Sequence, residues 1–307
     1  GDGGRGAGGG EPAEPPEGAG LDAPAGAVVS FWLKDAPKEA ELVSLEILDG
    51  EKVLRRFTSE KRDEKAAEEA ESPVEKPLEP VAGLNRFSWD LRGLKPSLVP
   101  KAVLWGSKDG PLVAPGRYGV RVTAFGETRT ANVEVVPNPA VKFSREELAR
   151  QAALLAELTT ALSRTHETVR VLRDTRAQVA AIASRAKKAG AGLSVDGAAT
   201  ALDRRLLAAE SALVNPKLKS PQDVLNFPPA LDHQIVGLLS AVSSADAPPT
   251  AGSVAYWNEL KGALASAERD ARDVLEAGVN GFNEELAAAG IPPVISRPVA
   301  GRKVPGR

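Results

Sequence analysis

The period of the apolar residues changes from two to seven at Pro137-Asn138-Pro139, and this change constrains the fold more than any other feature. Upstream of it, apolar residues alternate with polar ones, as in strands that bury one face. Downstream, they recur in sevens, as along a helix that packs against other helices. Because proline cannot continue a β ladder, the sequence predicts a β domain over residues 26–137 and a helical domain over residues 138–293.

Short alternating runs separated by turn residues fill the first of these domains. Asp49-Gly50, between two of the runs, is a typical hairpin turn. Six or seven short strands in about 110 residues predict a small antiparallel β-sandwich. The expected strands cover residues 28–33, 42–48, 52–58, 84–92, 117–124 and 129–136.

Helix signals begin at Ser144 and Glu147, which have the spacing of a capping box. Behind them, two rows of residues recur every seven positions, with Gln151 and Thr165 as polar exceptions. This seam predicts a long helix packed against others, and further apolar patterns predict helices over 195–213, 229–243 and 250–290. Together they predict an antiparallel α-helical bundle with long helices, so the chain is expected to be an α+β multidomain protein. The two rows are Leu148, Leu155, Leu162 and Val169, and Leu158, Leu172 and Val179.

Four stretches lack a regular apolar pattern. Residues 1–25 are rich in Gly and Pro and predict a disordered linker, because they offer too little apolar surface to offset the entropy lost on ordering. Residues 59–82 carry many charges and predict a mobile acidic loop, and residues 93–116 predict a second loop that ends in turn residues. Residues 294–307 predict a polar tail.

Composition argues against several classes of function. The 39 basic and 41 acidic side chains leave a net charge of −2, so no excess of positive charge is present to bind nucleic acid. The absence of cysteine excludes disulfides, thiolate zinc sites and cysteine nucleophiles. No run of about 18 apolar residues occurs, so no membrane span is expected. Because methionine is absent even at position 1, we expect this chain to be a fragment without its true N-terminus.

Motifs for catalysis, cofactor binding and metal binding are absent from the sequence. It contains neither a Gly-x-x-x-x-Gly-Lys phosphate loop nor a Gly-x-Ser-x-Gly nucleophile elbow. His166 and His233 each neighbour a carboxylate, but consecutive helical residues do not face each other. Adjacent acids such as Glu146 and Glu147 are typical of helix capping and do not face each other across a substrate. The sequence therefore predicts no catalytic, cofactor-binding or metal-binding residue.

Four residues are candidates for contact with a ligand or another domain. Trp105 lies in the second predicted loop, where an exposed aromatic ring could stack on a sugar. Trp32 alternates away from the inward face of its strand and is expected to face solvent or a neighbouring domain. If Trp89 points inward, Asp90 and Arg92 point outward, where they are expected to form a cross-strand or interdomain ion pair.

Several strings resemble one known family, namely residues 40–58, GLNRFSWDLR at 83–92, residues 110–139, the helix at 162–182, and ELAAAGIPP at 285–293. They resemble the C-terminal region of large bacterial BNR-repeat, sortilin-like β-propeller proteins, often labelled glycosyl hydrolases. The β part also resembles the immunoglobulin-like domain of flagellar hook-capping proteins. The resemblance implies an immunoglobulin-like β-sandwich, an extracellular or periplasmic setting, and a propeller domain upstream. The propeller's Asp-box (Ser-x-Asp-x-Gly-x-x-Trp) does not occur here, so no catalytic residue is carried over.

The residues and the resemblance together predict a non-catalytic C-terminal accessory or interaction module of a larger secreted protein, without cofactors. Its expected partners are the upstream propeller domain, a second copy paired as a homodimer through the helical seam, and a glycan. One alternative is part of a glycoside hydrolase whose catalytic residues lie upstream. Another is a carbohydrate- or surface-binding module that uses Trp105, and a third is a scaffold for filament or secretion assembly.

Overall fold

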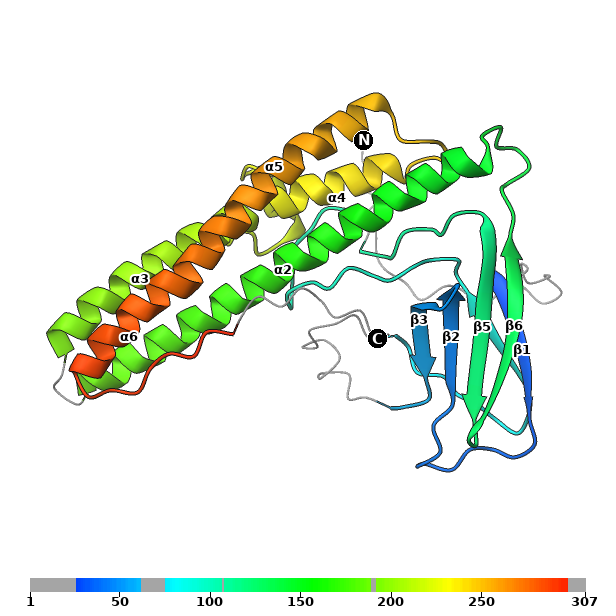
Figure 1. The fold of residues 1–307 in the computed structure, drawn as a ribbon, viewed down its shortest axis with the longest axis horizontal. Helices are drawn as coiled ribbons and strands as arrows, with labels where there is room; N and C mark the ends of the chain where they lie inside the picture. Colours follow the sequence, from blue (N-terminus) through cyan, green and yellow to red (C-terminus); the bar gives the residue numbers. More distant parts are fainter. Residues whose placement is uncertain (1–25, 62–74, 107, 189–191, 298–307) are drawn as a thin grey trace, which may run out of the picture.

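A computed structural model describes residues 26–61, 75–106, 108–188 and 192–297. Antiparallel sheets lie beside one end of a long helical region (Figure 1). The predicted α+β class is therefore confirmed. The predicted linker 1–25, the centre of the predicted acidic loop and the end of the predicted tail lie outside the described residues.

The β region, residues 26–137, contains two antiparallel sheets. The predicted hairpin joins the strands Ser44–Asp49 and Lys52–Thr58, and because Asp49 pairs with Lys52 its two turn residues are Gly50 and Glu51. Gly50 has a φ of 59°, a value that glycine adopts without strain. The smaller sheet pairs β1 (Ala27–Leu33) with β4 (Gly83–Trp89), and the larger has the order β3 (Lys52–Thr58), β2 (Ser44–Asp49), β5 (Gly116–Ala124), β6 (Glu127–Val135).

Both sheets contribute to one apolar core. Trp89 of β4 is fully buried and meets Tyr118 of β5 edge-on, with 5.5 Å between the ring centroids. The indole Nε1 of Trp89 donates to the carbonyl of Arg92 at 3.0 Å, and the Tyr118 hydroxyl donates to the carbonyl of Ala114 at 2.7 Å. Each ring therefore buries its apolar body while its polar atom keeps a partner, which is the arrangement that buried Trp and Tyr require.

The helical region, residues 138–297, begins with the predicted capping box. The Ser144 hydroxyl accepts from the amide of Glu147 at 3.2 Å, and the Glu147 carboxylate accepts from the amide of Ser144 at 2.8 Å. All nine residues of the predicted seam, the two polar exceptions included, are buried. The helices are α2 (Arg145–Lys188), α3 (Gly192–Leu213), α4 (Leu231–Val242), α5 (Ala251–Asp273) and α6 (Val279–Ala288).

Two short irregular turns were not predicted. A 3-10 turn, η1 (Pro221–Leu225), precedes α4, and a π turn, η2 (Val274–Gly278), divides the expected last helix into α5 and α6. At Gly278 a β carbon would lie 3.1 Å from Cδ1 of Leu202. The absence of a side chain at Gly278 therefore allows η2 to lie close to α3.

Polar side chains fix how α2 lies against its neighbours. Gln151 Nε2 donates to the carbonyls of Val242 and Ala245, at 2.7 and 2.6 Å, at the end of α4. Glu210 of α3, 2% exposed, accepts from Arg173 and Arg176 of α2. The seam that could have formed a homodimer is thus covered by helices of the same chain.

The segment after β4 leaves the β region and packs on the helices (Figure 1). We call residues 94–106 the docking segment. The chain on either side of it is held together, since Gly93 donates to Pro111 O at 2.8 Å and Val113 donates to Leu91 O at 2.9 Å. Val99 and Leu104 of the docking segment are buried in the apolar core of the helical region. A stretch predicted as a loop is therefore an anchor between the two regions.

Two other stretches without a regular pattern are anchored where they are described. At the end of the predicted acidic loop, Glu75 forms a 2.6 Å ion pair with Arg55, and the amide of Leu78 donates to Thr58 O at 2.8 Å. At the start of the predicted tail, Val294 is 3% exposed and its amide donates to the Asn283 side chain at 2.8 Å. No helix in the described part of the chain combines the length and the apolar character needed to cross a bilayer.

Candidate functional site

Asp90 and Arg92, two of the four candidates, hold the base of the docking segment. Asp90 Oδ1 accepts from Nη1 of Arg55 and from the amide of Arg92, both at 3.1 Å. Arg92 Nη1 donates to the carbonyl of Gly110 at 2.9 Å. Asp90 thus forms an ion pair between strand β3 and the end of β4, while Arg92 joins the two sides of the segment's base.

The two candidate tryptophans are exposed and lie in different parts of the molecule. Trp105 is 63% exposed and is followed by Gly106, which lies against α4. A β carbon at Gly106 would lie 2.4 Å from Val236 Cγ1 and 2.9 Å from the Ser240 hydroxyl. Trp32, 72% exposed, lies on the outer face of β1. The two rings therefore belong to separate surfaces.

Trp32 is part of an exposed apolar strip on the smaller sheet. It lies directly opposite Leu84 of β4, which is 60% exposed. We call Trp32 and Leu84 the Trp32 strip. Val28, on the same face of β1, is 42% exposed but is separated from them by the pair of Ser30 and Arg86. Adjacent large exposed apolar side chains are typical of a surface that contacts another molecule.

A buried cluster of ionisable side chains lies beneath the docking segment, and sequence reasoning missed it. Asp232 accepts from Nδ1 of its neighbour His233 at 3.1 Å and lies 3.9 Å from Nε2 of His166. His166 and Asp232 are 1% and 3% exposed. The amide of Val99 in the docking segment donates to Nδ1 of His166 at 3.3 Å. The fold therefore brings both histidines of the chain to one carboxylate.

Burial dominates the protonation of this cluster. It lowers the pKa of His166 from 6.5 to about 4, with the positive charges of Arg170 and Arg173 acting in the same direction. The negative charge of Asp232 opposes this shift without reversing it. His166 is therefore neutral at pH 7, which leaves Nδ1 free to accept from the docking segment.

Arg170 gives the docking segment a second attachment on the same helix. Its Nη2 donates to the carbonyl of Leu98 at 3.1 Å, and the amide of Ser97 donates to the hydroxyl of Ser163 at 3.0 Å. Because the histidine cluster is enclosed beneath these contacts, it supports the segment and does not open to a dissolved substrate. Among the described residues, no three His, Asp or Glu side chains are arranged to hold a metal ion.

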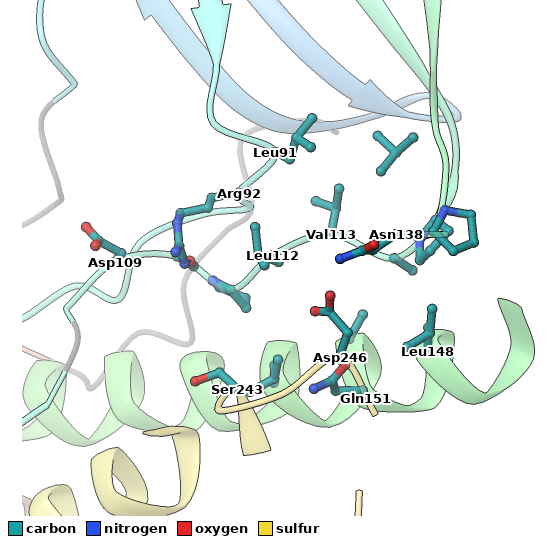
Figure 2. A pocket seen from close by; sticks show the side chains of 18 of the residues that line it. Leu91, Arg92, Asp109, Leu112, Val113, Asn138, Leu148, Gln151, Ser243 and Asp246 are labelled. Carbon is teal, nitrogen blue, oxygen red and sulfur yellow. The ribbon is translucent and has the colours of Figure 1, made fainter. Parts of the chain in front are cut away.

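A cavity of about 380 Å³ lies between the β region and the helical region (Figure 2). Its apolar wall comes from both regions, with Leu91 and Leu112 on one side and Leu148 and Leu155 of α2 on the other. Its polar lining includes Arg92, Asp109, Asn138, Gln151, Ser243 and Asp246. Of the predicted candidates, only Arg92 lines this cavity.

No match was found when the chain was compared with models of protein families, with curated proteins and with solved structures. The geometry of the chain's own residues is therefore the basis for assigning a role.

The cavity and the histidine cluster depend on contacts between residues far apart in the sequence. His166 meets Val99 67 residues away, and Gln151 meets Val242 91 residues away. The local signal that could have drawn attention to the cluster is Asp232-His233, which follows Pro228-Pro229 at the start of a predicted helix. A carboxylate in a first helical turn is, however, usual for favourable interaction with the helix dipole.

Proposed function

We propose that this chain is a non-catalytic accessory module of a larger extracellular or periplasmic β-propeller protein, and that it contacts the propeller domain through the Trp32 strip. The observation that carries the proposal is the strip itself, in which Trp32 and Leu84 lie side by side and more than half exposed. Full burial of a large apolar side chain is worth roughly 1.5–3 kcal/mol, so a partner that covers both would gain appreciable affinity.

The proposal includes a finer description of the two regions. We infer that the β region is an immunoglobulin-like β-sandwich and that the helical region is an antiparallel bundle. The Tyr118 hydroxyl, near the start of β5, donates to Ala114 O four residues upstream, and this supports the first inference because immunoglobulin-like domains contain such a tyrosine corner. The burial of the whole predicted seam of α2 supports the second.

The position of the strip suits a partner in the same polypeptide. Trp32 lies on β1, the first strand after the predicted linker, so a preceding domain would be close in sequence to this face. The docking segment fixes the β region to the helical region, since its Val99 and Leu104 lie in the helical core. The module would therefore present a rigid surface to the propeller domain.

Hydroxyl-radical footprinting tests this proposal directly. The labelling of Trp32 and Leu84 is measured in this chain alone and in the longer natural protein that contains it. We expect both residues to be strongly protected in the longer protein, whereas Leu225, 71% exposed in η1, keeps its labelling and serves as the control. Equal labelling of Trp32 in the two proteins would contradict the proposal.

Carbohydrate binding through Trp105 is a second candidate, which the exposure of this ring on an anchored segment favours. Glycan-array binding by the chain should then be lost in Trp105→Ala and kept in Trp32→Ala. Absence of binding on a broad array would count against this candidate.

A further inference from the structure

We propose that the cavity between the two regions binds a small dipolar molecule with an aliphatic body, such as a dipeptide of aliphatic amino acids. This ligand goes beyond the proposed docking on a propeller domain and does not depend on it. A volume of about 380 Å³ lies within the range of small-molecule sites, roughly 300–1,000 Å³. Cavities at the junction of two structural regions are also favoured places for such sites.

The wall of the cavity selects an aliphatic ligand. Leucines from both regions line it, and neither Trp, Phe nor Tyr contributes to the lining. Leu91 enters from the β region with a φ of 57°, an uncommon conformation for a residue other than glycine. Leu239 of α4 closes the wall from the helical region. Branched aliphatic groups on a ligand would therefore meet side chains of similar chemistry on both sides.

The charged side chains of the cavity lining are two carboxylates, Asp109 and Asp246, and one guanidinium, Arg92. The carboxylate of Asp246 points toward Val113 and Asn138 (Figure 2), and the structure gives it no hydrogen bond or ion pair within the described residues. The Oδ1 of Asn138 accepts from the amide of Ala140 at 3.0 Å, which leaves its NH₂ group as a donor. A ligand ammonium group would therefore find an acceptor at Asp246.

Arg92 supplies the complementary charge. One of its guanidinium nitrogens, Nη1, binds the carbonyl of Gly110 at 2.9 Å and so fixes the side chain against the cavity. Guanidinium groups bind carboxylates through two parallel hydrogen bonds, so the remaining nitrogens suit a ligand carboxylate. The ligand that fits these groups has an ammonium at one end, a carboxylate at the other and branched aliphatic side chains between them. A short aliphatic peptide has all three features.

Binding at this place would stabilise the junction, because the ligand would contact residues of both regions. A molecule that binds only the folded protein raises its melting temperature. We therefore expect the dipeptide Leu-Leu to raise the melting temperature of the chain and to give a saturable signal in isothermal titration calorimetry. Isoamylamine, which lacks the carboxylate, and 4-methylpentanoate, which lacks the ammonium, should bind at least tenfold more weakly.

Two variants and one matched control locate the site. Asp246→Asn removes the unpaired charge, and because Asp246 is exposed to solvent, Leu-Leu should bind up to about fivefold more weakly. Ala152→Phe places a ring in the cavity and should abolish binding. Ala153→Phe, on the exposed neighbouring residue outside the cavity, should bind as the unchanged chain does.

Calorimetry also supplies the results that would overturn the proposal. Absence of binding by Leu-Leu to the unchanged chain would refute it, and so would unchanged binding in Ala152→Phe. Binding of isoamylamine as tight as that of Leu-Leu would show a cation site instead of a dipolar one. Circular dichroism of each variant without ligand establishes that it is folded before binding is compared.

Discussion

The β region and the helical region bury their residues by different chemistry. The core of the β region is aromatic at its centre, where Trp89 meets Tyr118 and Phe57 meets Phe87. The core of the helical region is largely aliphatic, and it contains buried hydroxyl groups such as that of Thr165, which bind the carbonyl one turn earlier. Among the described residues, the β region extends a segment into the core of the helical region, with Val99 and Leu104 buried there. The boundary at Pro137 therefore separates types of secondary structure but does not separate the two cores.

This asymmetry shows which part of the chain holds the two regions together. The buried contact of the β region with the helices comes from the connection between β4 and β5 (Figure 1), whereas strand β6 contributes the exposed ion pair of Glu134 with Arg145. Three side chains of α2 receive this connection, namely Ser163, His166 and Arg170. Substitutions in the docking segment or in the side chains that bind it should therefore change the stability of both regions. Substitutions on the outer surfaces should not.

The largest effect is expected from Trp89→Ala. Removing a fully buried aromatic side chain costs about 3–5 kcal/mol, through lost burial and the cavity left behind. Because the docking segment starts just after β4, the helical region should lose stability too. Urea unfolding followed by far-UV circular dichroism and by the fluorescence of Trp257, which is buried in α5, measures the stability of the helical region. Trp32→Ala, on the exposed face, should change the unfolding free energy by no more than about 0.5 kcal/mol. An unchanged helical transition in Trp89→Ala would show that the two regions are independent.

Acid should weaken the joint through His166. Its pKa is lowered from 6.5 to about 4 in the folded protein, so between these values the unfolded chain binds the proton and the folded chain does not. The free energy of unfolding therefore contains the full contribution of His166 above pH 6.5. It falls by about 3 kcal/mol in total as the pH is lowered to about 4.

Comparison with His166→Gln isolates this contribution from the general effect of acid on carboxylates. Urea unfolding of both proteins at pH 7 and at about pH 4 gives the difference. The unchanged chain should lose more stability than the variant over this range. If the two proteins lose the same amount, His166 is not the group that titrates.

Gly106→Ala should detach the docking segment with an intermediate effect. The new β carbon would lie 2.4 Å from Val236 Cγ1, and overpacking of this kind typically costs about 1–3 kcal/mol. Gly237→Ala is the matched change on α4 itself, where no atom lies within 4 Å of the β carbon. It should stabilise the helix by about 0.8–1 kcal/mol. The melting temperature should therefore fall in Gly106→Ala and rise in Gly237→Ala. A shift of both melting temperatures in the same direction would contradict the contact at Gly106.

The smallest effect is expected at the surface between β6 and α2. Glu134 and Arg145 form a 3.0 Å ion pair between the regions, with side chains 62% and 50% exposed. Exposed pairs of this kind contribute about 0.2–1 kcal/mol, less at high salt. A double-mutant cycle with Glu134→Gln and Arg145→Gln measures the coupling. A coupling above about 2 kcal/mol would place the main link between the regions here instead of in the docking segment.

Local patterns predicted the parts of the fold that local chemistry determines. The capping box at Ser144, the hairpin at Asp49-Gly50 and the buried seam of α2 follow from spacings of a few residues, and the structure contains all three. The docking segment could not be predicted in this way. Its two prolines, Pro96 and Pro100, indicate irregular backbone, and whether it packs depends on the helices, which follow it in sequence.

The candidate sites show the same limit. Exposure of Trp32 followed from strand alternation, a local rule. The cavity instead requires Leu91, Leu155 and Leu239 to come together from three distant parts of the chain. Sequence reasoning also treated His166 and His233 separately, because nothing local indicates that Asp232 lies beside both.

Gln151 fixes the alignment of α2 along α4. In a seam of leucines, α2 could slide along α4 by one heptad and still bury apolar surface. The slide would place the Gln151 amide among leucines and leave the carbonyls of Val242 and Ala245 without their donor. Each unsatisfied buried group costs about 1–3 kcal/mol, so the shifted arrangement is rejected. A residue that interrupts the apolar pattern thus selects one alignment, and it does so by penalising the alternatives.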